Sequence, residues 1–134
     1  MVLIKENEFC RFHFEGSIVL VTIIKSVPSE EEWEWTKMIM LSFYESAEIS
    51  NKKISIIFDL RLIGILPMKY YKEWSDLFIS LKEKTQKYIH KTSILVDNVL
   101  IKTSLNCFFS IYTTVRPMKF VDSIDDGKKF VSIS

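Results

Sequence analysis

Three short runs of aliphatic, largely β-branched residues constrain the fold of this chain more than any other feature. They are Ile18–Ile24, Ile54–Leu60 and Thr92–Val96, and each is almost continuously apolar. Strands of this kind are typical of a sheet that is covered on both faces. Such coverage comes from helices that connect parallel strands, so the runs predict an α/β protein with a mainly parallel sheet.

The segment between the first two runs has helical periodicity. Ser29 followed by Glu32 is the pattern of a capping box and predicts a helix over about Ser29 to Glu48. Trp33 falls outside the expected buried stripe of this helix. That stripe consists of Trp35, Ile39, Phe43 and Ala47, at helical spacing.

The segment between the second and third runs also predicts a helix. Pro67 suits the first turn of a helix because its fixed φ is already helical. The expected apolar stripe of this second helix is Tyr70, Trp74, Leu77, Leu81, Thr85 and Tyr88.

The two ends of the chain complete the pattern. Residues Glu8 to Glu15 alternate between apolar and polar, which is typical of a half-buried strand, and Gly16 allows a hairpin turn into the first apolar run. Val99 to Tyr112 predicts a shorter helix, and a last strand includes Met118 and Phe120. Ser123-Ile124-Asp125-Asp126 is a second capping motif, before a terminal helix that packs through Phe130 and Val131.

The predicted order is therefore β-β-α-β-α-β-α-β-α within one domain, residues 1–134. We expect a single mixed, mostly parallel five-stranded sheet with an N-terminal hairpin and about four helices.

Composition excludes several classes of protein. The chain has 134 residues, is 48% hydrophobic and carries a net charge of +1, so it is neither disordered nor strongly charged. This balance gives no electrostatic reason to expect nucleic acid or an anionic membrane as partner. The longest apolar run, Ile18–Ile24, is too short to span a bilayer.

The cysteines and the N-terminal residues favour a reducing, cytoplasmic setting. Cys10 and Cys107 are far apart and lie among aromatic residues, so buried free thiols are expected rather than a disulfide or a metal site. Lys5, Glu6 and Glu8 occupy positions where a signal peptide needs apolar residues.

The residues able to do chemistry form no recognisable catalytic pattern, so no catalytic residue, metal site or cofactor is predicted. His13 and His90 are expected to be surface or structural residues. Asp59 and Asp97 follow neighbouring strands, where two carboxylates could bind a metal or share a proton, or could cap the following turns. Gly64 stands alone, so there is no glycine-rich phosphate loop.

Three segments carry a resemblance to a known family. "ISIIFDLRLIGILP", "TSILVDN" and "RPMKFVDSIDDGKKF" resemble strands and loops of the STAS domain, named from sulfate transporters and anti-sigma-factor antagonists. The closest likeness is to the branch of STAS-like proteins whose shape is similar to the CRAL-TRIO lipid-binding fold. The resemblance implies an α/β interaction module and covers nearly the whole chain.

The loop after the second apolar run departs from the family pattern. In the anti-sigma antagonists this loop continues into a serine that a partner kinase phosphorylates, and the added charge disrupts docking. The corresponding positions here are Leu66, Pro67, Met68 and Lys69, none of which has a hydroxyl group. The serine of that switch therefore cannot be carried over to this chain.

Two main functions remain open. The first is a non-enzymatic STAS-like module that binds a protein partner or a second copy of itself. Its contact residues would be Leu62, Ile65, Leu66, Met68 and Tyr71.

The alternative is a small carrier or sensor of an apolar, lipid-like ligand. Its pocket would lie between the sheet and the helices, lined by Trp35, Met38, Trp74 and Phe78. Core packing is the competing interpretation of these aromatic residues. A third possibility is an enzyme that uses Asp59, Asp97 and His13.

Overall fold

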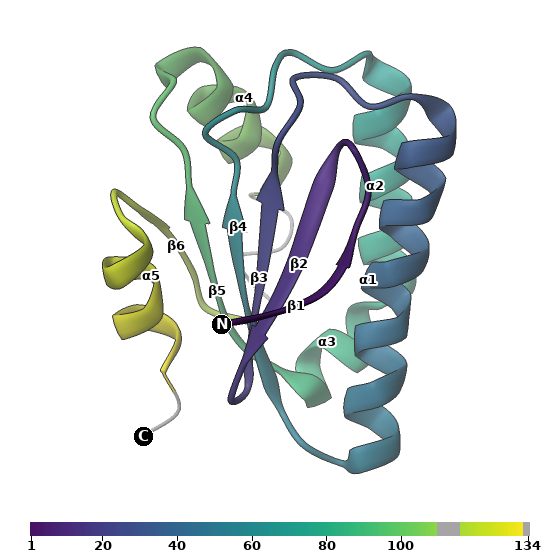
Figure 1. The fold of residues 1–134 in the computed structure, drawn as a ribbon, viewed down its shortest axis with the longest axis vertical. Helices are drawn as coiled ribbons and strands as arrows, with labels where there is room; N and C mark the ends of the chain where they lie inside the picture. The colour runs from purple at the N-terminus through teal and green to yellow at the C-terminus, as the bar shows by residue number, and fades with distance from the viewer. Residues whose placement is uncertain (110–115, 133–134) are drawn as a thin grey trace.

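The computed structural model describes residues 1–109 and 116–132, without the side chains of residues 107–109. Three consecutive strands come first, helices connect the later strands, and helices lie on both faces of one sheet (Figure 1). The strands are β1 (Val2–Glu6), β2 (Cys10–Glu15), β3 (Ile18–Ile23), β4 (Ile54–Asp59), β5 (Ile89–Leu95) and β6 (Met118–Val121). The helices are α1 (Glu30–Ser50), α2 (Met68–Ser80), α3 (Lys82–Tyr88), α4 (Val99–Phe109) and α5 (Ile124–Val131).

Within residues 1–109 and 116–132, the sheet has six strands in the order β1-β2-β3-β4-β5-β6. The pairs β1–β2 and β2–β3 are antiparallel, and the remaining pairs are parallel. The mixed, mostly parallel sheet is confirmed, but the predicted count of five strands was wrong. The additional strand is β1, whose charged Lys5 and Glu6 concealed the short apolar run before them.

The predicted second helix is two helices, so the described residues contain five helices where four were expected. The chain leaves the α-helical conformation at Leu81, with φ −96° and ψ 8°, and its side chain is buried. The apolar stripe continues through Leu81, so the sequence pattern did not reveal the break. β5 then begins at Ile89 rather than Thr92, and the Arg116 guanidinium donates to the carbonyls of Ile89 and His90. The end of the predicted helix Val99 to Tyr112 lies outside the described residues.

Helix α1 begins as predicted and faces the sheet differently. Its capping box is confirmed, because the Ser29 hydroxyl accepts from the Glu32 N–H and the Glu32 carboxylate accepts from the Ser29 N–H. Trp33, which we placed outside the stripe, is buried. The buried residues of α1 are Trp33, Thr36, Met40, Tyr44 and Ala47.

The predicted stripe is only partly buried, because it faces the antiparallel side of the sheet. The Phe12 ring lies 6.0 Å from Trp35 and 5.6 Å from Phe43, measured between ring centroids. Helix α1 therefore packs on the sheet through a wide apolar surface, and the sequence pattern identified only half of that surface.

The opposite face of the sheet is covered by α5, on the far side from α1 and α2 (Figure 1). Two buried serines hold this helix. The Ser55 hydroxyl donates to the Val131 carbonyl at 2.9 Å, and the Ser93 hydroxyl donates to the Gly127 carbonyl at 3.0 Å. These two polar residues explain why the buried strands are not wholly apolar.

Candidate functional site

Three loops meet at the edge of the sheet where β3, β4 and β5 end, which is where α/β proteins usually place binding residues. The loop after β3 and the loop after β4 are joined directly. The Gly64 N–H donates to the Ser26 carbonyl at 2.7 Å. A Cβ atom at position 64 would lie 3.1 Å from the Ser26 Cβ, so the two backbones approach as closely as glycine allows.

Large apolar side chains from these loops project into solvent. Leu62, Ile65 and Met68, three of the predicted contact residues, are between 62% and 80% exposed. The loop after β3 adds a further exposed side chain, and the start of α4 adds two. We call the whole set the strand-end patch: Val27, Leu62, Ile65, Met68, Val99 and Leu100.

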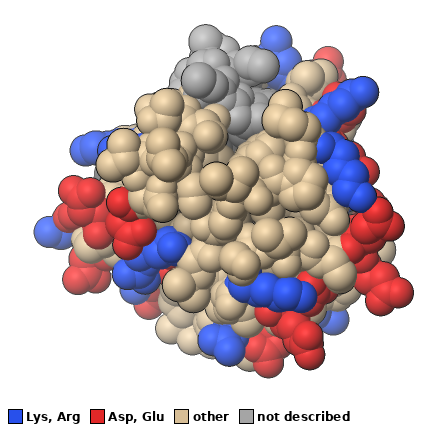
Figure 2. Space-filling view, turned by 90° about the horizontal axis from the view of Figure 1, so that it is seen from above, with Lys and Arg blue, Asp and Glu red and all other residues tan. Residues whose placement is uncertain are grey.

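Figure 2 looks onto this end of the molecule. Uncharged residues occupy the centre of the view, whereas Lys, Arg, Asp and Glu lie mostly around the margin. Exposed apolar side chains such as those of the strand-end patch, surrounded by a charged margin, are typical of a protein–protein interface.

Two of the predicted contact residues lie differently. Leu66 is buried, and Tyr71 is half-buried behind it; the Leu66 N–H donates to the Tyr71 hydroxyl at 3.5 Å. Leu66 therefore anchors the loop to the core and takes no part in the exposed surface. Three of the patch residues were not predicted. Val99 and Leu100 looked like the apolar side of a helix in the sequence, and Val27 was not singled out.

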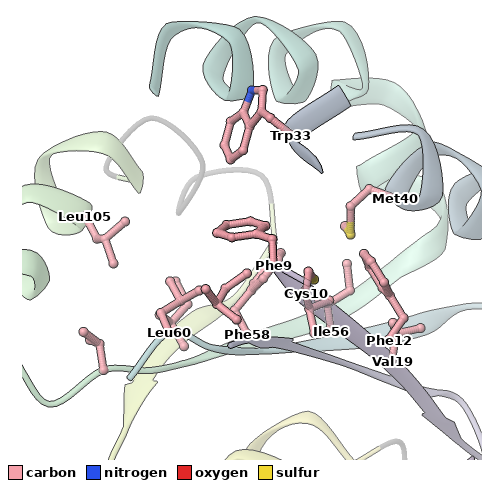
Figure 3. Close-up of a cluster of buried hydrophobic side chains, with 14 of the residues drawn as sticks. Phe9, Cys10, Phe12, Val19, Trp33, Met40, Ile56, Phe58, Leu60 and Leu105 are labelled. Atoms are coloured by element: carbon pink, nitrogen blue, oxygen red, sulfur yellow. The ribbon is translucent and has the colours of Figure 1, made fainter. Parts of the chain in front are cut away.

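A small apolar cavity lies beneath the β4–α2 loop. Its volume is about 60 Å³, and its lining includes Phe9, Trp33, Leu66, Trp74 and Leu105. In Figure 3 the side chains of Phe9, Leu60 and Leu105 gather on one side of the Trp33 ring, and the indole nitrogen points away from Phe9. That nitrogen is buried and has no hydrogen-bond partner among the described residues.

Of the four residues predicted to line an apolar pocket, only Trp74 reaches this cavity. Phe78 packs against the Trp74 ring at 5.2 Å between centroids. Trp35 and Met38 instead line a groove on the outer surface of the helices. An apolar cavity of about 150 Å³ holds a molecule the size of benzene. A cavity of about 60 Å³ is therefore too small for a lipid chain.

Asp59 is held by a neighbouring arginine. The Arg61 guanidinium donates to both carboxylate oxygens of Asp59, at 3.0 and 2.8 Å, and the Arg61 N–H donates at 3.2 Å. This hydrogen bonding raises the pKa of Arg61 above its usual value. Asp59 therefore caps the turn after β4, which is one of the two predicted alternatives.

The strand end beside it is capped by Asn98 and not by Asp97. The Asn98 side-chain oxygen accepts from the N–H groups of Leu100 and Ile101, at 3.0 and 3.2 Å. Across residues 1–109 and 116–132, no three His, Cys, Asp or Glu side chains come together in a way that could hold a metal ion.

The two histidines lie on strands that are not neighbours. His13 is on β2 and His90 is on β5, with β3 and β4 between them. Burial, together with the positive charges of Lys91, Arg116 and Lys53, lowers the pKa of His90. His90 also lies at the opposite end of the sheet from Asp59, so His90 and Asp59 do not share a site.

The cysteine that the structure describes is a buried thiol. Cys10 is a free cysteine with no exposed surface, and burial raises its pKa to about 12. The free, buried state predicted for Cys10 is confirmed. The side chain of Cys107 lies outside the described part of the chain.

Comparisons with known proteins address the fold. No family model matches the chain, and no curated protein sequence matches it. Among solved structures, an uncharacterized protein of the DUF3478 family with a SpoIIAA-like fold, from Shewanella loihica, matches with a TM-score of 0.63 and 16% identity. The match covers 96% of this chain and 99% of that one.

A second match is an anti-sigma factor antagonist from Mycobacterium paratuberculosis, with a TM-score of 0.55 and 9% identity, over 91% of this chain and 92% of that one. At such identities the likeness establishes the fold alone. The chain therefore has the α/β fold of STAS-like, or SpoIIAA-like, domains, as the sequence resemblance implied. None of the described helices has the length and apolar character needed to cross a bilayer.

Proposed function

We propose that this chain is a non-enzymatic regulatory module that binds a protein partner, or a second copy of itself, through the strand-end patch. The observation that carries the proposal is a set of six exposed, large apolar side chains at one end of the sheet, from the loops after β3 and β4 and from the first turns of α2 and α4. Monomeric proteins rarely leave such a surface uncovered without a binding role.

The size of the patch supports this role. Six side chains of this kind offer on the order of several hundred Å² of apolar surface, against about 800 Å² per partner in a standard interface. Burying about 500 Å² would contribute on the order of 10 kcal/mol before the costs of association. The Gly64–Ser26 hydrogen bond favours binding further, because it fixes two of the three loops in advance.

The β4–α2 loop also supports a module without the phosphorylation switch. Helix α2 begins at Met68, and Pro67 before it makes no side-chain cap. No residue from Arg61 to Lys69 carries a hydroxyl group. We therefore propose that docking at this loop does not depend on a phosphoserine. The solved anti-sigma factor antagonist, which has a similar fold, is a precedent for the proposed regulatory role. A cytoplasmic setting is part of the proposal, in keeping with the free thiol of Cys10.

The carrier of an apolar ligand has less support. The cavity under the β4–α2 loop is about 60 Å³, and most of the residues predicted to line a pocket lie elsewhere. We therefore favour the docking module over the carrier.

The test compares a patch variant with a control variant that loses exposed apolar side chains elsewhere on the surface. The patch variant carries Leu62→Ser, Ile65→Ser and Met68→Ser; the control carries Ile49→Ser and Ile79→Ser, which remove exposed apolar residues outside the patch. Sedimentation velocity over a concentration series measures self-association, and pull-down from the source cell measures partner binding. We expect the patch variant alone to lose its assembly or its partner. Unchanged behaviour of the patch variant in both measurements would contradict the proposal.

A further inference from the structure

The outer surface of the two long helices carries a groove that is separate from the strand-end patch. Helices α1 and α2 lie side by side on the sheet (Figure 1), and the groove between them faces solvent. We call it the α1–α2 groove. Its apolar residues include Met38, Leu41 and Leu77, and its acidic residues include Glu34, Glu73 and Asp76.

The apolar part of the groove is open to solvent. Met38 is 62% exposed, although it lies in the middle of a helix that packs on the core. Leu41 and Leu77 are half-buried beside it, one from each helix. The sequence analysis had assigned Trp35 and Met38 to a possible apolar pocket, and the structure places both in this groove.

The charged part of the groove has one dominant sign. Five carboxylates line it, from Glu30, Glu31, Glu34, Glu73 and Asp76, and the only cation in its described lining is Lys37. That cation is already shared, because its ammonium lies 2.8 Å from Glu34 and 3.8 Å from Glu73. The chain as a whole has a net charge of +1, so the acidic character of the groove is local and does not reflect the composition of the whole protein.

Helix capping explains only part of this charge. Glu30 and Glu31 stand in the first turn of α1, where carboxylates complement the helix dipole, and Glu30 also pairs with Lys69. Glu73 and Asp76 lie in the middle of α2, where the dipole does not favour a negative charge. Their position beside an exposed apolar floor points to a ligand that is both apolar and basic.

We propose that the α1–α2 groove docks an amphipathic helix of a partner protein, with an apolar stripe flanked by lysine or arginine. The groove extends along α1 from Glu31 to Leu41, about 15 Å or three helical turns, which is enough to seat such a helix. The apolar stripe covers Met38, Leu41 and Leu77. The basic flanks face Glu31 on one side and Asp76 on the other. The groove is separate from the strand-end patch. The proposal about the groove can therefore be tested separately from the proposed function.

The probe is a fluorescein-labelled, 18-residue helical peptide of leucine and lysine with a single apolar stripe, and its binding is followed by fluorescence anisotropy. Two groove variants test the two parts of the site: Glu73→Lys with Asp76→Lys reverses two of the five negative charges, and Met38→Ser removes the exposed methionine side chain. The matched controls are Glu45→Lys with Glu83→Lys, which reverse two exposed charges elsewhere, and Ile49→Ser on α1; none of these residues lines the groove. Circular dichroism confirms that each variant is folded.

We expect each groove variant to weaken peptide binding by about fivefold or more, and each control to change it by less than about twofold. The same peptide with glutamate in place of lysine should not bind. Equal effects of groove and control variants would overturn the proposal, as would equal binding of the acidic peptide. Loss of peptide binding in the strand-end variant Leu62→Ser/Ile65→Ser/Met68→Ser would also overturn it, because the peptide would then sit on the patch.

Discussion

The Gly64 N–H donates a hydrogen bond to the Ser26 carbonyl over 2.7 Å, and this contact joins two loops that are 38 residues apart in the sequence. One loop carries Val27, and the other carries Leu62 and Ile65. The strand-end patch therefore depends on the backbone as well as on the side chains, because this backbone contact brings the apolar residues of both loops to one surface.

Replacing Gly64 by alanine should separate these loops. The new Cβ would lie 3.1 Å from the Ser26 Cβ and 3.2 Å from the Ser26 carbonyl oxygen, which is closer than ordinary contact. We expect Gly64→Ala to lower the free energy of unfolding by about 1–2 kcal/mol, as measured by urea denaturation.

The same-loop control is Ile65→Ala, which shortens an exposed side chain and should change stability by less than about 0.5 kcal/mol. If Gly64→Ala proves as stable as the parent protein, the loops are not held together by this contact.

The sequence predicted the order of elements well where a local signal was strong. The Ser29–Glu32 capping box fixed the start of α1, and the three apolar runs fixed β3, β4 and most of β5. Such signals depend only on residues close in sequence, so they can be recognised without knowledge of the fold.

The errors concern residues whose environment is set by distant parts of the chain. β1 forms because its backbone pairs with β2, in a register that opposes Val2 to Phe14. Trp33 is buried because Tyr70 and Trp74 of α2 lie 4.9 and 5.3 Å from its ring. Leu66 turns inward because the cavity-lining residues of α1 and β4 accept it. In each case a tertiary contact decides whether the residue is paired or buried, and the hydrophobic periodicity of the sequence does not reveal that contact.

The thiol of Cys10 should resist modification. Burial raises its pKa from 9.0 to about 12, so at a given pH the thiolate is about a thousandfold scarcer in the folded protein than in the unfolded chain. In a Cys107→Ser background, we expect Cys10 to react with a disulfide reagent at pH 8 at least about a thousandfold more slowly in buffer than in denaturing urea. Comparable rates under the two conditions would show that the thiol is accessible in the folded state.

Two substitutions of Gly127 should have opposite effects. A Cβ at this position of α5 would lie 3.5 Å from Ile57, Ser93 and Val121, which is ordinary van der Waals contact. Gly127→Ala should therefore raise the free energy of unfolding by about 0.5 kcal/mol, since alanine restricts the unfolded chain. Gly127→Leu has no room between α5 and the sheet and should lower it by about 2 kcal/mol or more. Urea denaturation measures both, and equal stability of the two variants would show that α5 is not packed this closely.

Glu32 should make stability depend on pH in the acid range. Its hydrogen bond from Lys25, together with that from the Ser29 N–H, lowers the pKa of Glu32 in the folded state. Because the folded pKa lies below the unfolded value, near 4.5, the stabilisation is present above pH 4.5 and is lost as the pH falls through the folded pKa.

Glu32→Gln should therefore be less stable than the parent protein at pH 7, and this difference should shrink towards pH 3. Urea midpoints across pH 3–7 measure it, with Glu31→Gln as the control, because Glu31 makes no ion pair with any described residue. A difference that stays constant with pH would mean that the carboxylate charge contributes nothing to the cap.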